Sequence, residues 1–135
     1  MMDSIVFDYK MEQIGDERYL NIDTYINNKR LFPDLRINIF CLEESTQTSG
    51  EYSLFTCVCG DEGCAGIFRS PDVLVDNNTI TWTIYEPIAY TFRFDKKTLI
   101  KTIAHLKKSL LNERSFKEWK HIEYTPCSCV ADFLK

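Results

Sequence analysis

The 135-residue chain is 44% hydrophobic and 13% aromatic, a composition typical of globular proteins that predicts a single domain over residues 1–135. The 20 acidic residues outnumber the 16 basic ones, and the net charge of -4 disfavours binding to the phosphate backbone of nucleic acids. No secretion signal opens the sequence and no apolar run is long enough to cross a bilayer, so we expect a cytoplasmic protein without a membrane partner.

The first third of the chain predicts two strands and two turns. Residues 4–9 are β-branched and aromatic, which favours a strand, and Gly15 is a turn signal after them. Residues 19–26 alternate in the two-residue period of a strand, with the even-numbered positions on one face. The Asn27-Asn28 pair tolerates positive φ angles and predicts the second turn.

The middle of the chain predicts further strands. Residues 31–42 carry apolar side chains at alternate positions and fit either a short helix or a strand, of which we favour the strand. Residues 45–50 are small and polar, which is typical of a loop. Residues 52–59 predict a strand, and the glycine-rich connection to residues 64–68 predicts a hairpin.

Three strands and the best helix of the chain follow. Residues 73–75, 79–85 and 90–94 predict the strands, the second of which alternates between apolar and polar positions. Asp95 is a candidate N-cap, and it precedes an apolar stripe with the spacing of a helix: Leu99, Ile103, Leu106 and Leu110. We therefore expect an α+β fold, a mostly antiparallel β-sheet built of hairpins with one main C-terminal α-helix packed on it.

Half of the six cysteines lie in one short segment. Cys57, Cys59 and Cys64 surround Gly60 and Gly63. Thiolates suit zinc, which takes four ligands in a structural site, and the glycines leave room for backbone amides to turn toward the sulfur atoms. A candidate structural zinc site would draw its fourth ligand from one of these residues: Cys41, Cys127, Cys129, His105 or His121.

The string Cys57-x-Cys59-Gly60-x3-Cys64-x-Gly66 resembles the zinc-binding segment that follows the catalytic part of SET-domain lysine methyltransferases. The likeness covers ten residues, and the chain lacks both the Asn-His-x-Cys motif of that family and the length of its fold. It implies a zinc knuckle and no methyl transfer. Two other interpretations stay open: buried free thiols, since the flanking residues are apolar, and a disulfide, which a reducing cytoplasm disfavours.

A thiol enzyme would need a thiolate beside a histidine, so Cys57 or Cys64 would have to meet His105 or His121. Both histidines lie in stretches typical of partly exposed surface. The sequence contains no phosphate loop, dinucleotide fingerprint, GxSxG motif or His-Glu-x-x-His motif. We therefore expect a protein that is not an enzyme and has no catalytic residues.

Acidic residues are concentrated in the middle of the chain. Such a run is often only a solvated surface, and the alternative is a surface that binds a basic partner. The candidate residues for that partner-binding surface are Glu43, Glu44, Glu51, Asp61 and Glu62.

A longer pattern resembles a family of small bacterial proteins with a CxCGxxxCAG hairpin. It combines Ile-Asn-Asn-Lys-Arg-Leu at 26–31, the cysteine segment at 52–67, Trp82, and the aromatic segment at 90–95. Some similar chains resemble immunity proteins of contact-dependent growth-inhibition and polymorphic toxin systems.

The resemblance implies an immunity protein whose partner is a cognate toxin domain, a basic nuclease, which it neutralises by covering the active site with carboxylates. The alternative is a regulatory or housekeeping module, stabilised by a zinc knuckle, with another protein partner.

Overall fold

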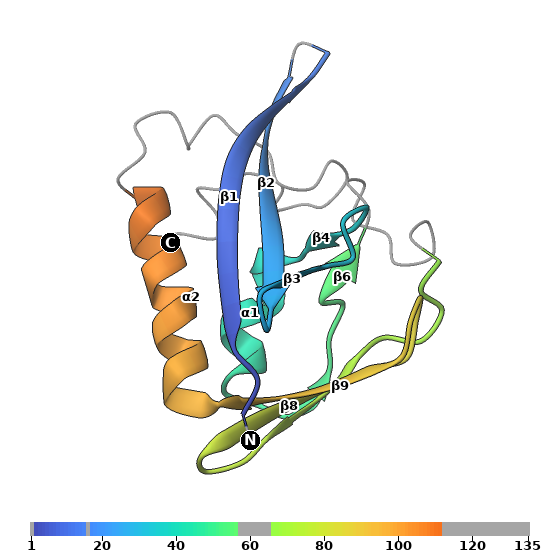
Figure 1. Cartoon of the computed structure of the whole chain (residues 1–135), viewed down its shortest axis with the longest axis vertical. Helices are drawn as coiled ribbons and strands as arrows, with labels where there is room; N and C mark the ends of the chain where they lie inside the picture. The colour runs from blue at the N-terminus through green and yellow to red at the C-terminus, as the bar shows by residue number, and fades with distance from the viewer. Residues whose placement is uncertain (1, 16, 57–65, 112–135) are drawn as a thin grey trace.

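The computed structural model describes residues 2–15, 17–56 and 66–111 (Figure 1). In chain order, the elements are β1 (Ile5–Ile14), β2 (Glu17–Ile26), β3 (Lys29–Leu31), β4 (Arg36–Ile37), α1 (Ile39–Ser45), β5 (Gly50–Glu51), β6 (Phe55–Thr56), β7 (Asp72–Val75), β8 (Thr79–Ile84), β9 (Tyr90–Asp95) and α2 (Lys96–Leu111). Neither helix of this described part has the length and apolar character needed to cross a bilayer.

The predicted α+β fold is confirmed. Every strand pair in the described ranges is antiparallel, and the main helix follows the last strand. The strands are divided among a three-stranded sheet with the order β1-β2-β3, a two-stranded sheet of β4 and β6, and a four-stranded sheet with the order β5-β7-β8-β9. In Figure 1, α2 runs alongside β1, and the far end of the β1–β2 hairpin extends past the helix.

The predicted turns around β2 are present. Gly15 has a φ angle of +61° where β1 leads toward β2, a conformation that glycine adopts without steric cost. Asn27 and Asn28, with φ angles of 53° and 67°, form the two-residue connection from β2 to β3. Ile22, among the even-numbered residues of β2, is buried as its alternation predicted.

The strand predicted over residues 31–42 is wrong beyond residue 38, because α1 begins at Ile39. Ile39 and Leu42 are both buried, and they lie three residues apart, so one face of a helix carries them into the core. A short apolar run satisfies both the helical and the strand period, which is why the pattern did not separate them.

The strands predicted on either side of the cysteine segment are shorter than expected. Only residues 55–56 of the described part of 52–59 form a strand, and residues 66–68 form none. Gly66 turns the chain with a φ angle of +80°, and the amide of Phe68 donates a hydrogen bond to the carboxylate of Glu86 at 2.6 Å instead of joining a ladder.

The main helix begins and packs as predicted. The Asp95 carboxylate accepts hydrogen bonds from the Thr98 amide at 3.0 Å and from the Thr98 hydroxyl at 2.7 Å, which is the geometry of an N-cap. The helix contacts β1, β9 and α1. Its predicted apolar stripe is buried at all four positions: Leu99, Ile103, Leu106 and Leu110.

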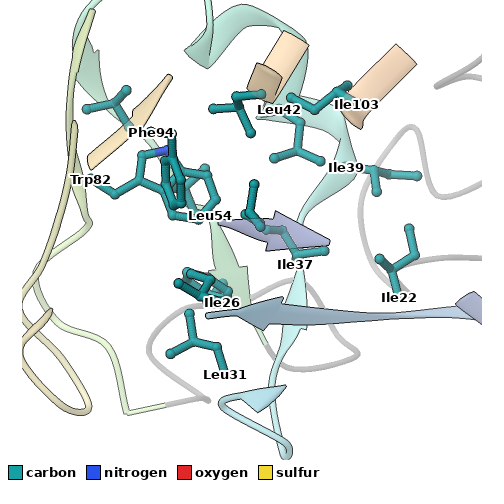
Figure 2. Packing of buried hydrophobic residues seen from close by; sticks show 14 of the residues in the cluster. Ile22, Ile26, Leu31, Ile37, Ile39, Leu42, Leu54, Trp82, Phe94 and Ile103 are labelled. Carbon is teal, nitrogen blue, oxygen red and sulfur yellow. The ribbon is translucent and has the colours of Figure 1, made fainter. Parts of the chain in front are cut away.

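Aromatic contacts join β6, β8 and β9 within the core. Trp82 is fully buried in β8 and meets Phe94 of β9 at 4.9 Å and Phe55 of β6 at 6.2 Å, both edge to face. Figure 2 shows Trp82 and Phe94 side by side within the buried cluster. The contacts continue into a closed loop, here called the aromatic circuit: Phe32, Phe55, Trp82, Phe94, Phe92 and Tyr90.

Replacing Leu99 by alanine should lower the free energy of unfolding by about 2–5 kcal/mol, because a fully buried leucine leaves a cavity when it is truncated. Leu99 is 1% exposed, whereas its neighbour Ile100 is 42% exposed. Ile100→Ala is therefore the matched control, with an expected loss of about 1 kcal/mol or less. Urea denaturation of both variants measures the difference, and equal losses would contradict the placement of the helix.

Replacing Asp95 by alanine should destabilise the protein at pH 7 and much less in acid. The hydrogen bonds from Thr98 hold the pKa of Asp95 below its ordinary value of 3.8, with Lys97 and Lys101 acting in the same direction. A lowered folded-state pKa contributes stability above pH 3.8 that is lost as the pH falls through the folded value. Denaturation curves from neutral to strongly acidic pH should show the gap between wild type and Asp95→Ala narrowing.

The control for this titration is Asp95→Asn, which keeps an oxygen acceptor at the cap but has no proton to gain. The difference in unfolding free energy between Asp95→Asn and Asp95→Ala should stay constant with pH, while the difference between wild type and Asp95→Ala narrows in acid. A wild-type gap that does not change with pH would contradict the cap.

Candidate functional site

Most of the predicted site residues lie outside the described residues. These are Cys57, Cys59, Cys64, Cys127, Cys129, His121, Asp61 and Glu62. The zinc knuckle and the hairpin around it therefore stay predictions. Within the described ranges, no three His, Cys, Asp or Glu side chains come together as a metal site.

Two of the candidate ligands for the fourth zinc position are described. Cys41 is half-buried in α1, and the single proton of its thiol is shared between two acceptors, the carbonyl oxygens of Asn38 at 3.4 Å and Ser53 at 3.6 Å. His105 is exposed on α2. The Cys41 contacts fasten the first turn of α1 to the chain before β6.

Among the three predicted acidic contacts that the structure describes, Glu43 differs from Glu44 and Glu51 because its carboxylate is already paired. It forms an ion pair of 2.8 Å with the Lys107 ammonium, which joins α1 to α2. Both residues border a hollow of about 150 Å³ between the helices, whose apolar lining includes Ile100 and Ile103. Glu43 is therefore a weaker candidate for a partner contact than its neighbour Glu44.

Two carboxylates face each other at one edge of the four-stranded sheet. Glu51 of the edge strand β5 is the cross-strand partner of Asp72 in β7, so both side chains project from the same face. The Asp72 carboxylate accepts a hydrogen bond from the Tyr85 hydroxyl. The Arg69 guanidinium lies 3.5 Å from the centre of the Tyr85 ring, a cation–π contact on the same cluster.

A second tyrosine lies beside Glu51 in the chain. The Tyr52 hydroxyl donates a hydrogen bond to the Thr48 carbonyl at 2.5 Å and lies 3.4 Å from the carbonyl oxygen of Glu44. Burial raises the pKa of Tyr52 above its ordinary value of 10.0, and the negative charge of Glu44 raises it further. Glu44 thus lies close enough to Tyr52 for its charge to act there.

The pKa of Tyr85, the tyrosine beside Asp72, is also raised. The hydrogen bond to Asp72 is the largest cause that raises the pKa of Tyr85 above 10.0, followed by burial, while the charges of Asp72 and Glu51 add to it and Arg69 opposes it. We name this group the acidic edge: Glu44, Glu51 and Asp72 with Tyr52 and Tyr85.

The sequence pointed to Glu44 and Glu51 but not to the other members of the acidic edge. Asp72 belongs to the same acidic stretch of sequence, and the alternation along 79–85 placed Tyr85 on the outer face. What the sequence did not supply is the pairing of β5 with β7, which brings Glu51 opposite Asp72.

Comparisons with protein-family models, with curated proteins and with solved structures find no significant match. Chemically, the acidic edge offers carboxylates that accept hydrogen bonds from basic side chains, beside two tyrosines that supply rigid apolar area and a polar tip. This combination suits recognition of a basic surface.

Replacing Tyr85 by phenylalanine should destabilise the protein below pH 10 and less above it. A tyrosine whose folded pKa is raised contributes stability that is fully present below its unfolded pKa and is lost as the pH rises through the folded value. The gap in unfolding free energy between wild type and Tyr85→Phe should therefore stay constant up to about pH 10 and narrow as the pH rises above it. Urea denaturation across this range measures it.

Tyr90→Phe is the matched control, because the Tyr90 hydroxyl forms no hydrogen bond with the rest of the described chain. At neutral pH, the difference in unfolding free energy between wild type and Tyr90→Phe should be smaller than that between wild type and Tyr85→Phe. If Tyr85→Phe and Tyr90→Phe behave alike at every pH, the hydroxyl of Tyr85 is not bound to Asp72 in solution.

Proposed function

We propose that this protein is a non-enzymatic binding protein that neutralises a basic toxin domain, as an immunity protein does, and that the acidic edge is its contact surface. The observation that carries the proposal is the pairing of Glu51 with Asp72 across β5 and β7, which places two carboxylates opposite each other. Glu44 and Glu51 form no ion pair with any described residue.

Like charges opposite each other on neighbouring strands destabilise a sheet. The Tyr85 hydroxyl relieves part of this repulsion by donating to Asp72, which leaves the Glu51 carboxylate exposed at the edge. An arginine or lysine of a partner that approached Glu51 and Asp72 would remove the remaining repulsion. Binding would then be favoured by relief of the repulsion between the two carboxylates, which is present in the unbound protein.

The two tyrosines supply contact area that is ordered before binding, which favours a tight interface. Tyr52 and Tyr85 are half-buried, and each is held in place by a hydrogen bond from its hydroxyl. Tyrosines that are rigid before binding lose little conformational entropy in a complex, and tyrosine is enriched among residues that dominate binding energy. The acidic edge therefore combines charge with preorganised contact area.

The charge of the whole chain supports the same partner. A net charge of -4 accelerates the approach of a basic protein and slows that of nucleic acid. A nuclease domain carries basic residues where it binds phosphates, so an acidic surface of this kind can occupy that site and exclude the substrate.

The first experiment concerns growth. If a large secreted protein is encoded beside the gene of this chain, expression of its C-terminal domain alone is expected to stop bacterial growth. Co-expression of this chain should restore growth, and the purified pair should form a complex. Growth arrest that this chain does not relieve, with no complex formed, would contradict the proposal.

The acidic edge itself is tested by the double charge reversal Glu44→Lys/Glu51→Lys. Binding to the toxin domain, measured by calorimetry, should weaken by about tenfold or more at low salt, because two attractive contacts become repulsive. Raising the salt concentration should weaken wild-type binding and narrow this difference.

Asp34→Lys is the control for this experiment, since Asp34 is exposed in the loop after β3 and undergoes the same reversal of charge, at one position instead of two. It should leave affinity close to the wild-type value. Equal affinities for the double variant and the wild type, or binding that does not respond to salt, would exclude this edge as the interface.

A further inference from the structure

The opposite edge of the four-stranded sheet carries a hollow of about 270 Å³. It lies between the β2–β3 hairpin and β9, whereas the acidic edge includes β5, which is separated from β9 by two strands of the sheet. The residues that line it are Ile26, Asn27, Lys29, Arg30, Leu31, Tyr90 and Phe92.

The body of the hollow is apolar and aromatic. Ile26 and Leu31 form one wall, and Figure 2 shows them together at the end of the buried cluster farthest from Ile103 in that view. The rings of Tyr90 and Phe92 form the other wall, with centroids 5.2 Å apart and planes 19° apart. Tyr90 is 39% exposed, so this aromatic wall reaches the solvent.

The walls are fixed by contacts behind them. Phe32 is buried with a φ angle of 47°, a conformation that is sterically unfavourable for a bulky residue. Its ring packs edge-on against Phe55 at 5.2 Å and contacts Tyr90 at 5.8 Å, which closes the aromatic circuit. Surrounding contacts that hold an unfavourable backbone conformation in place are typical of functional sites. The hollow therefore has its shape before any ligand enters.

Two cationic residues, Lys29 and Arg30, belong to this lining. Lys29 is the cross-strand partner of Ile26, so its side chain leaves the hairpin on the core-facing side, although the residue itself is exposed. No described residue forms an ion pair with Lys29. Arg30, the next residue, starts on the other face and is paired with Asp23 at 2.7 Å. The ammonium of Lys29 is thus left for a ligand.

We propose that this hollow binds a small aromatic carboxylate, with its ring between the two walls and its carboxylate on the Lys29 ammonium. The volume is slightly below the roughly 300–1,000 Å³ of pockets for drug-sized ligands, which limits the ligand to about one ring with a short acidic chain. Aromatic walls favour a flat ring, and the charge at the mouth selects an anion. The inference is independent of the toxin partner, because it depends on a different edge of the sheet.

The probe for the test is 3-phenylpropionate, titrated into isotopically labelled full-length protein while amide chemical shifts are recorded. The largest shifts are expected at the lining residues Ile26, Lys29, Leu31, Tyr90 and Phe92. The alcohol 3-phenylpropan-1-ol, which keeps the ring without the charge, should bind more weakly, and propionate, which lacks the ring, should bind more weakly still.

Lys29→Ala should weaken binding of 3-phenylpropionate about tenfold, as expected for the loss of one hydrogen bond to a charged group. Lys10→Ala, which removes an exposed lysine from β1, is the matched control and should bind as the wild type does. Tyr90→Ser should also weaken binding, because it removes one of the two rings of the aromatic wall. Tyr90 is partly exposed, so this variant is expected to fold.

Three results would overturn the proposal: no saturable shifts with 3-phenylpropionate, shifts centred away from the lining residues, or equal affinity in Lys29→Ala and wild type. Binding of the tripeptide Gly-Gly-Phe without binding of the free acid would also overturn it. In that case the hollow accepts the C-terminus of a protein instead of a small molecule.

Discussion

The fold depends on the burial of Trp82. Its indole lies between Phe55 of the two-stranded sheet and Phe94 of the four-stranded sheet, so a single side chain joins two sheets that share no backbone hydrogen bonds in their ladders. The aromatic circuit then returns through Phe92, Tyr90 and Phe32. Because the circuit is closed, each of its rings is fixed by two neighbours, and this fixes the edges of the sheet that the rings border.

The two proposed binding surfaces follow from the two edges of the four-stranded sheet. At β5 the strand is only Gly50–Glu51, and its pairing with β7 places one carboxylate opposite another. At β9 the aromatic circuit reaches solvent beside the β2–β3 hairpin, which contributes Lys29. One edge is thus acidic and the other is apolar with a cation.

The sequence predicted local structure well where one period dominates. The alternation of Ile80, Trp82 and Ile84 and the helical stripe through Leu99 and Ile103 both gave the correct element and the correct buried face. It failed over 39–42, where Ile39 and Leu42 satisfy a helix that a short apolar pattern could not distinguish from a strand.

The candidate site was predicted only in part, because its geometry depends on long-range pairing. Glu44 and Glu51 were visible as acidic residues, but only the register of β5 with β7 shows that Glu51 faces Asp72. The hollow was not predicted at all. The proposed role of Lys29 depends on its cross-strand partner Ile26 and on Tyr90, which is far along the chain, and no local pattern encodes such a meeting.

The segment before β1 covers part of the outer edge of β9, which affects how readily this protein associates in concentrated solution. The Asp3 amide donates a hydrogen bond to the Arg93 carbonyl, and the Asp3 carboxylate accepts one from the Arg93 amide, both at 2.8 Å. These bonds occupy outward-pointing backbone groups of β9 that another chain could otherwise use to extend the sheet. Asp3 thereby blocks part of this edge against strand-by-strand polymerisation, and the two-residue length of β5 gives a growing fibril little to pair with at the other edge.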